Sequence, residues 1–161
     1  MAAQLTEKEL EKKILENFSE VASAIGYSPL HGKIIGVLLV KDRPVSLQEL
    51  ARDTGYSTSM ISLSLDFLEI LEVIKKVKKT GDRKLYVQLH GDLLGILKKA
   101  VLIRVKKSLS NSLSEFEESK KYISGLDKDE KARVTKTLDV LENELRRLQG
   151  YLDLLSGIEL P

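Results

Sequence analysis

Residues 45–74, VSLQELARDTGYSTSMISLSLDFLEILEVI, carry the pattern of two short helices joined by a turn. Ser46 precedes the apolar positions of the first helix, Gly55 supplies a break, and Ser57 precedes the second helix. Serine is a favoured residue at the start of a helix, and glycine readily adopts the left-handed conformation that ends one. The apolar positions of the second helix recur at helical spacing: Ile61, Leu65 and Leu68. The stretch therefore predicts a helix-turn-helix with one buried face.

A short basic hairpin is predicted directly after these helices. VIKKVKK at 73–79 and KLYVQL at 84–89 have the pattern of two β-strands, and TGDR at 80–83 separates them. Candidates for the packed face of the hairpin are Val77, Leu85, Val87 and Leu89. Residues 75–84 contain six cations and one carboxylate, a net charge of +5. Cations crowded in this way repel one another unless phosphates neutralise them, although lysines also protect exposed strand edges from aggregation.

The second helix and the hairpin contain the candidate DNA contacts. In a helix-turn-helix, the second helix presents its early residues to the major groove. In this helix the expected contacts are Ser57, Thr58, Ser59, Met60 and Ser62. In the hairpin they are Lys78, Lys79, Arg83 and Lys84. Arg83 is the best candidate to enter a minor groove. The competing interpretation is that the hydroxyl side chains are merely solvated positions of the helix.

Long amphipathic helices are predicted on both sides of these elements. The first covers about residues 6–25, and two more cover about 92–124 and 127–155. The helix from residue 92 has a predicted apolar ridge: Leu94, Leu97, Val101, Val105, Leu109, Leu113, Phe116 and Ile123. The same helix carries a second basic cluster: Lys98, Lys99, Arg104, Lys106 and Lys107. That cluster either extends a DNA footprint, lies at a dimer surface, or consists of lysines whose stems run along the helix.

The last helix carries the pattern of a coiled-coil seam. Its apolar residues alternate between steps of four and three: Val134, Leu138, Leu141, Leu145, Leu148, Leu152 and Leu155. These residues can pack on the preceding helix or on the same helix of a second chain. We expect both contacts, because further apolar residues widen this face of the helix beyond the seam.

The composition excludes several classes of function. The 161 residues are 42% hydrophobic and 31% charged with a net charge of +2, which suits one folded domain with an extension. There is no cysteine, and His31 and His90 are the only histidines. The chain therefore has few of the side chains that usually bind metals or act as acid–base catalysts. No phosphate-binding loop or zinc-protease motif occurs. No apolar run approaches the roughly 18 residues that span a membrane. We therefore expect a cytoplasmic protein that is not an enzyme and needs no cofactor.

The order of these elements resembles the MarR superfamily of winged-helix transcriptional regulators, and its GbsR-like branch most of all. The resemblance covers about residues 6–155, and its most specific part is 47–89. It rests on the LxxLA helix, the glycine turn, the serine-capped helix, the basic wing and the flanking helices. It implies a homodimer held by the amino- and carboxy-terminal helices, with two wings on a pseudopalindromic operator. A small-molecule effector pocket near the dimer and DNA-binding regions is also implied.

One feature departs from this family. Members commonly carry Arg or Lys on the recognition helix where this chain has Leu63 and Phe67, which form an apolar stripe with Ile70. Either the stripe packs on another part of a dimer, or this helix contributes weak sequence specificity. The stripe also leaves open a winged helix that binds protein.

The expected fold class is mainly α with a small β-hairpin wing, in which long C-terminal dimerisation helices follow a winged helix-turn-helix. The expected regions are an N-terminal helix for dimerisation and core support (1–27), a DNA-binding winged helix-turn-helix (28–91) and a coiled-coil-like helical hairpin for dimerisation (92–161). The expected function is sequence-specific regulation of transcription by a homodimer on double-stranded DNA, acting as a repressor that occludes a promoter, with an unidentified effector. The alternative is a winged-helix and coiled-coil module that binds protein without specific DNA binding.

Overall fold

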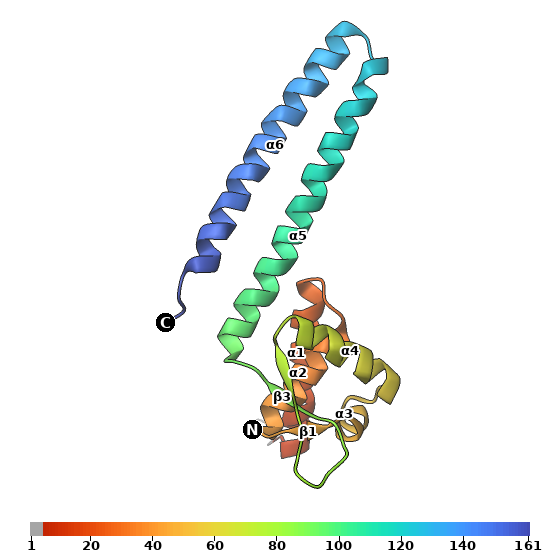
Figure 1. The fold of residues 1–161 in the computed structure, drawn as a ribbon, viewed down its shortest axis with the longest axis vertical. Helices are drawn as coiled ribbons and strands as arrows, with labels where there is room; N and C mark the ends of the chain where they lie inside the picture. Colours follow the sequence, from red (N-terminus) through yellow and green to blue (C-terminus); the bar gives the residue numbers. More distant parts are fainter. Residues whose placement is uncertain (1–4) are drawn as a thin grey trace. The chain divides into compact units, whose positions relative to one another are not determined.

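The computed structural model describes residues 5–161, and its internal contacts divide the chain into two compact units at Ile96. Helices make up most of the chain, and the strands form a small three-stranded sheet (Figure 1). This confirms the predicted fold class, mainly α with a small β wing that follows a helix-turn-helix.

The first unit contains the helix-turn-helix and the wing. Its described elements are α1 (Glu7–Ala24), α2 (Pro29–Lys41), β1 (Val45–Ser46), α3 (Leu47–Thr54), α4 (Thr58–Ile70), β2 (Ile74–Val77) and β3 (Tyr86–Leu89). Ser46 and Ser57 cap α3 and α4, because each hydroxyl accepts a hydrogen bond from the backbone N–H three residues later. Gly55 ends α3 with a φ of +77°, a conformation that suits glycine. The predicted caps and turn are confirmed.

The sheet has the strand order β1-β3-β2, and both pairs are antiparallel. In the wing, Ile74 pairs with Leu89 and Val77 with Tyr86. The sequence did not predict β1, since a strand of two residues is too short to show alternation. A turn is present at the expected Gly-Asp position, where the backbone N–H of Asp82 donates to the carbonyl of Lys79 at 3.1 Å, but the strands are shorter than expected, so residues 78–85 lie between the paired strands. The wing is therefore a long loop on a short two-stranded base.

The core of the first unit confirms the predicted inner face of α4. The largest fully buried side chains are Ile34, Val45, Leu50, Ile61, Leu65, Ile74 and Val87. Of the expected hairpin face, Val87 is buried and Val77 is only half-buried, while Ile74 supplies the core residue of β2. At the start of the predicted ridge on the long helix, Leu94 and Leu97 are exposed in the single chain, whereas Ile96, which the ridge did not include, packs into this core.

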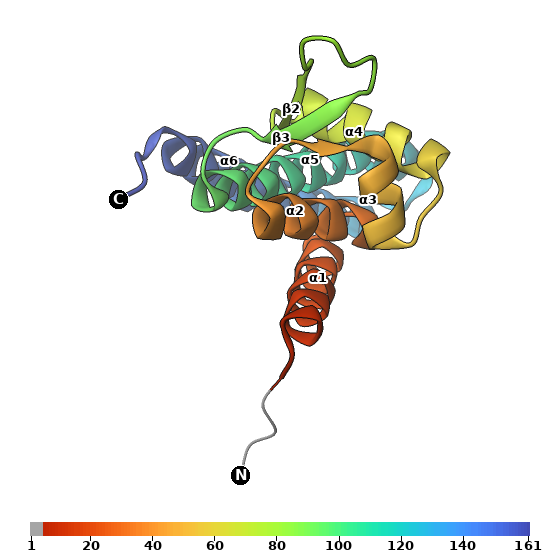
Figure 2. The same cartoon turned by 90° about the horizontal axis from the view of Figure 1, so that it is seen from below.

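α1 packs against α2 through a glycine (Figure 2). A Cβ atom on Gly32 would lie 2.1 Å from the carbonyl oxygen of Phe18, which is far inside van der Waals contact. The two helix backbones therefore approach one another directly at this point. Leu15 of α1 packs against the core of the first unit, whereas Leu10 and Val21 remain exposed.

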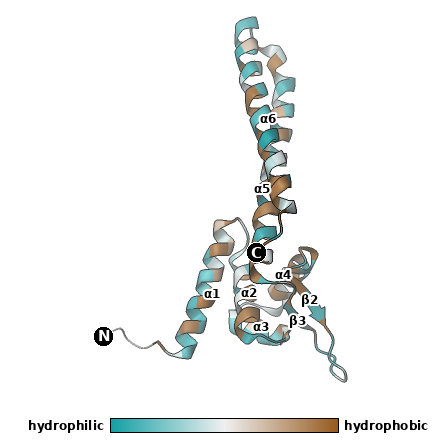
Figure 3. Ribbon diagram, turned by 90° about the vertical axis from the view of Figure 1, so that its left-hand side faces the viewer, coloured by the Kyte–Doolittle hydropathy of each residue, from teal (hydrophilic) through white to brown (hydrophobic). Residues whose placement is uncertain are grey.

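The second unit is an antiparallel helical hairpin. It contains most of α5 (Leu93–Tyr122), a 3₁₀ turn η1 (Ile123–Gly125) and α6 (Lys128–Gly157), which Asp127 caps. Apolar residues recur along both helices (Figure 3). Lys120 on α5 pairs with Asp139 at 2.8 Å and Glu142 at 2.6 Å on α6, and Lys106 pairs with Asp153 at 2.7 Å. These ion pairs connect the two arms at both ends of the hairpin.

The predicted seam on α6 separates into two sets. Within the single chain, Leu138, Leu145 and Leu155 are half-buried and Leu152 is buried. By contrast, the more exposed positions are spaced seven residues apart: Val134, Leu141 and Leu148, which keep 39%, 44% and 41% of their surface exposed. Val140, Tyr151 and Leu154 extend this exposed apolar surface.

Candidate nucleic-acid interface

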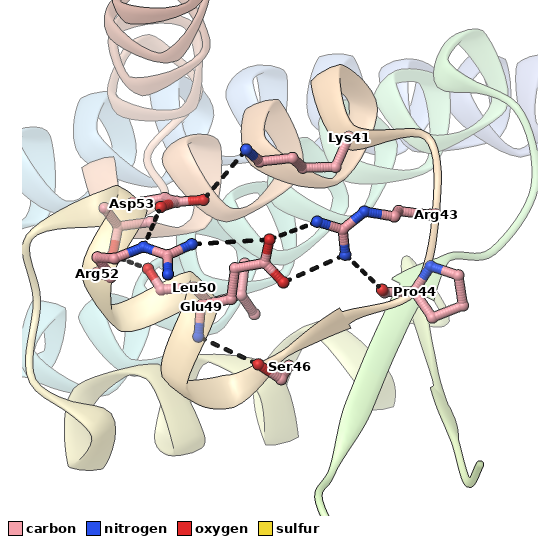
Figure 4. Close-up of polar contacts among 9 residues, drawn as sticks. Lys41, Arg43, Pro44, Ser46, Glu49, Leu50, Arg52 and Asp53 are labelled. Atoms are coloured by element: carbon pink, nitrogen blue, oxygen red, sulfur yellow. Dashed lines mark hydrogen bonds and ion pairs between the residues drawn. The ribbon is translucent and has the colours of Figure 1, made fainter.

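The first helix of the helix-turn-helix is held in place by ion pairs (Figure 4). Arg43 donates from both terminal guanidinium nitrogens to the Glu49 carboxylate, at 3.2 and 2.5 Å, and this pairing lowers the pKa of Glu49. Lys41, at the end of α2, lies 3.6 Å from Asp53 on α3, and Arg52 hydrogen-bonds to Asp53 at 3.0 Å. These contacts join α3 to the end of α2 and to the segment before β1.

The turn between α3 and α4 is fixed by Thr54, a residue that the sequence reasoning did not single out. Its hydroxyl donates to the backbone carbonyl of Leu50 at 2.7 Å and accepts from the backbone N–H of Tyr56 at 3.4 Å. Thr54 is buried, so these bonds satisfy a hydroxyl that would otherwise be costly to bury. A threonine directly before the turn glycine was the signal that could have identified it.

The leading end of α4 exposes the expected polar side chains. Ser57, Thr58, Ser59 and Met60 are exposed, while Ser62 is half-buried. The Ser57 hydroxyl accepts from the backbone N–H of Met60 at 3.3 Å, so its first role is to cap the helix. α4 contains no Lys or Arg and carries two carboxylates, Asp66 and Glu69. Any cations that help this helix approach a polyanion must therefore come from other elements.

The apolar stripe expected on α4 does not behave as one surface. The Phe67 ring stacks on His31 of α2, with ring centroids 4.8 Å apart, and lies 6.1 Å from the Tyr27 ring. In contrast, Leu63 and Ile70 expose 73% and 79% of their surface. Phe67 thus packs on another residue of its own unit. Of the stripe, Leu63 and Ile70 are the residues whose exposure is not accounted for by packing within the unit.

His31 is the residue that sequence reasoning most underestimated. Burial among these rings lowers its pKa, because the charged imidazolium loses hydration. Its Nδ1 atom is buried and has no hydrogen-bond partner among the described residues. His31 lies in the first turn of α2, and its ring acts as an aromatic spacer between α2 and α4.

The loop of the wing uses its one carboxylate internally. Asp82 accepts hydrogen bonds from the backbone N–H of Lys84 at 2.9 Å and from the Tyr86 hydroxyl at 2.7 Å. These bonds lower the pKa of Asp82 and raise that of Tyr86. The Lys79 ammonium lies 4.0 Å from the centroid of the Tyr86 ring, a cation–π geometry. Asp82 and Tyr86 thereby order the loop that carries the cations.

The remaining wing cations divide into two groups. Lys75, Lys78, Arg83 and Lys84 are exposed and make no ion pair with residues 5–161. Lys76, on β2, points instead to α4, where its ammonium lies 3.0 Å from Asp66 and 2.6 Å from Glu69. Hydrogen bonds to Glu69 and then Asp66 raise the pKa of Lys76. Lys76 therefore neutralises much of the negative charge on α4.

The structure gathers the expected DNA contacts on two neighbouring elements of the first unit. The helix residues 57–62 occupy the exposed leading end of α4, and the four expected wing residues lie in the 78–85 loop. The expected dimer residues are all on α6, in the second unit. Among residues 5–161 there is no cluster of three metal-ligating side chains, and no helix is long and apolar enough to cross a membrane.

Comparison with known proteins finds likeness in structure but not in sequence. No protein-family model and no curated protein matches the sequence. A crystal structure described as a transcriptional regulator is 18% identical with a TM-score of 0.53, and the match covers 89% of this chain and 98% of that one. A mutant of MepR from S. aureus bound to an oligodeoxyribonucleotide is 17% identical with a TM-score of 0.45, covering 86% of this chain and 99% of that one. MarR from E. coli in its apo form is 15% identical with a TM-score of 0.44, and the match covers 86% of this chain and 98% of that one. The first of these likenesses shows that the chain has the fold of that regulator.

Proposed function

We propose that this protein is a sequence-specific DNA-binding transcriptional regulator of the MarR superfamily, from its GbsR-like branch. The observation that carries the proposal is the division of charge in the wing. Lys78, Arg83 and Lys84 are exposed without ion-pair partners in the described chain, whereas Asp82 is bound internally. Exposed cations on an ordered loop beside a helix-turn-helix suit contacts with DNA phosphates.

In this proposal α4 enters the major groove and the wing binds the backbone or the minor groove. The expected contacts of α4 are Ser57, Thr58, Ser59, Met60 and Ser62. Those of the wing are Lys78, Lys79, Arg83 and Lys84. The ion pairs around Glu49 and Asp53 would hold α3 against the backbone while α4 contacts the bases. Regulation would follow from occlusion of a promoter, which makes the protein a repressor acting in the cytoplasm.

A homodimer is part of the proposal. Val134, Leu141 and Leu148 lie at heptad spacing and stay exposed in the single chain, so a second copy of α6 can cover them. Two copies related by a two-fold axis would match a pseudopalindromic site. The proposed regions remain 1–27 and 92–161 for dimerisation and 28–91 for DNA binding. For an unidentified small-molecule effector, a cleft of about 470 Å³ among α1, α2 and α3 offers room.

The alternative function is a protein-interaction module without specific DNA binding. It is favoured by the exposure of Leu63 and Ile70 and by the absence of Lys and Arg from α4. Exposed apolar side chains on a helix are suited to bind an apolar surface of another protein.

The test is binding of the purified 161-residue chain to random duplex DNA across a salt series, followed by sequencing of the retained fraction. The proposal predicts enrichment of a two-fold-symmetric sequence and a steep loss of affinity as salt rises. Salt-sensitive retention without an enriched sequence would contradict specific recognition. No retention even at low salt would favour the protein-interaction module.

A further inference from the structure

Leu63 stands at the centre of the outward face of α4. The buried residues of this helix lie on its opposite side: Ile61, Ser64, Leu65 and Leu68. Leu63 exposes 73% of its surface and lies in the second turn, close to the leading end. In an α-helix the Cα–Cβ bond tilts toward the amino terminus, so the Leu63 side chain leans over Ser59, one turn earlier. A short hydroxyl at Ser59 leaves this apolar group prominent.

The chemistry of α4 limits what it can read in a major groove. Guanine is most often recognised by two hydrogen bonds from Arg or Lys, and α4 has neither residue. Hydroxyl groups contact several bases and phosphates with little discrimination. Among the base edges of the major groove, thymine alone presents an apolar group, its C5 methyl. An exposed leucine on the outward face of α4 can therefore make an apolar contact with the C5 methyl of thymine.

We propose that Leu63 is a specificity-determining residue that contacts a thymine methyl group in the major groove. This inference rests on the proposed function, since it names the base chemistry that α4 reads. The source of the specificity is apolar contact, and the hydroxyls of the leading end allow the helix to approach closely.

The approach of α4 to DNA depends on the neutralisation of its carboxylates. Asp66 lies on the same outward face as Leu63, one turn later, where its charge would be repelled by phosphates. Lys76 reaches across from β2 and pairs with both Asp66 and Glu69. The wing therefore supplies the charge compensation that the recognition helix lacks, and it lets an apolar side chain come near the bases.

Ile70 serves as a matched control because it is as exposed as Leu63 on the same face. It lies seven residues later, about 10 Å further along the helix axis. A helix-turn-helix places the early residues of its second helix against the bases, so Ile70 lies beyond the expected contact region.

The experiment replaces thymine by uracil, which removes the methyl group and keeps the base pair. The probe is a duplex enriched from the random pool, with each thymine changed singly to uracil, and binding is measured by fluorescence anisotropy. Loss of one buried methyl predicts about fourfold weaker binding by the unaltered protein at the contacted position, or about 0.8 kcal/mol. Leu63→Ala should bind the thymine and uracil duplexes equally there, while Ile70→Ala should keep the fourfold difference. Thermal melts check that both variants fold.

The outcomes separate this inference from the function on which it rests. If no duplex is retained, both the proposed function and the inference fail. If the protein binds a specific duplex but no uracil position weakens binding, the function stands and the role of Leu63 is wrong. If Leu63→Ala responds to uracil as the unaltered protein does, another residue reads the methyl and the inference is overturned.

Discussion

Neutralising the exposed cations of the wing should reduce the salt dependence of DNA binding by a calculable amount. The triple variant Lys78→Gln, Arg83→Gln, Lys84→Gln removes three exposed cations of the wing loop that have no ion-pair partner in the described chain. It keeps Asp82 and Lys79, which order the loop through Tyr86. The variant should therefore retain the loop conformation and lose its charge.

The magnitude follows from counterion release. Each phosphate contact contributes about 0.9 to the slope of log affinity against log salt concentration. Three lost contacts lower the slope by about 2.7 for one wing, and six lower it by about 5.4 for the two wings of a dimer. Doubling the salt concentration should weaken DNA binding more in the unaltered protein than in the variant. The extra loss of affinity is about sixfold if one wing contacts the DNA and about fortyfold if both wings of a dimer do.

The assay is fluorescence anisotropy of a labelled duplex at salt concentrations from about 0.05 to 0.3 M, a range in which such slopes are measured. The matched control is Lys128→Gln, Lys131→Gln, Lys136→Gln, which removes the same charge from α6 in the second unit. Its slope should equal that of the unaltered protein. An unchanged slope in the wing variant, or an equal reduction in the control, would refute the assignment of phosphate contacts to the wing.

Three further outcomes are expected. Gly32→Ala should lower the free energy of unfolding by about 1–3 kcal/mol in urea melts, because the new Cβ would overlap the Phe18 backbone; Gly150→Ala on open helix surface should not destabilise. Because burial lowers the pKa of His31, the unfolded state takes up a proton more readily, and stability should fall as the pH drops below about 6.5. His31→Phe should lose less stability over that range, and equal losses would contradict the assignment. Leu148→Asp should convert a dimer into a monomer in sedimentation, whereas an unchanged mass would exclude this face of α6.

The sequence predicted the elements of the first unit well because their signals are local. A serine cap, a left-handed glycine and apolar residues at steps of three and four each act within one turn, so Ser46, Gly55 and Ser57 could be assigned from the sequence alone. β1 could not, since a strand of two residues exists only through its pairing with Val87. The same reason explains Ile96, which is buried by the distant core rather than by the periodicity of its own helix.

The candidate site shows where pattern reasoning reaches its limit. Six cations between residues 75 and 84 are equivalent in a sequence, yet the fold gives them different partners. Lys76 pairs with the carboxylates of α4, Lys79 lies on the Tyr86 ring, and Asp82 is occupied by Lys84 and Tyr86. These pairings join residues 2 to 10 positions apart through the fold of the wing, which no periodicity displays.

The consequence is that net charge is a poor guide to what this protein binds. The chain carries only +2 overall, and α4 by itself is negative. Because screening limits surface interactions to about 10 Å at 0.1 M salt, a polyanion responds to the local arrangement rather than to the sum. Lys76 offsets one of the two negative charges of α4, while the loop of the wing presents its cations outward. On the proposed function, a near-neutral protein thus offers a short basic ridge next to a helix whose negative charge is half offset, and its specificity would depend on side chains such as Leu63 rather than on cations.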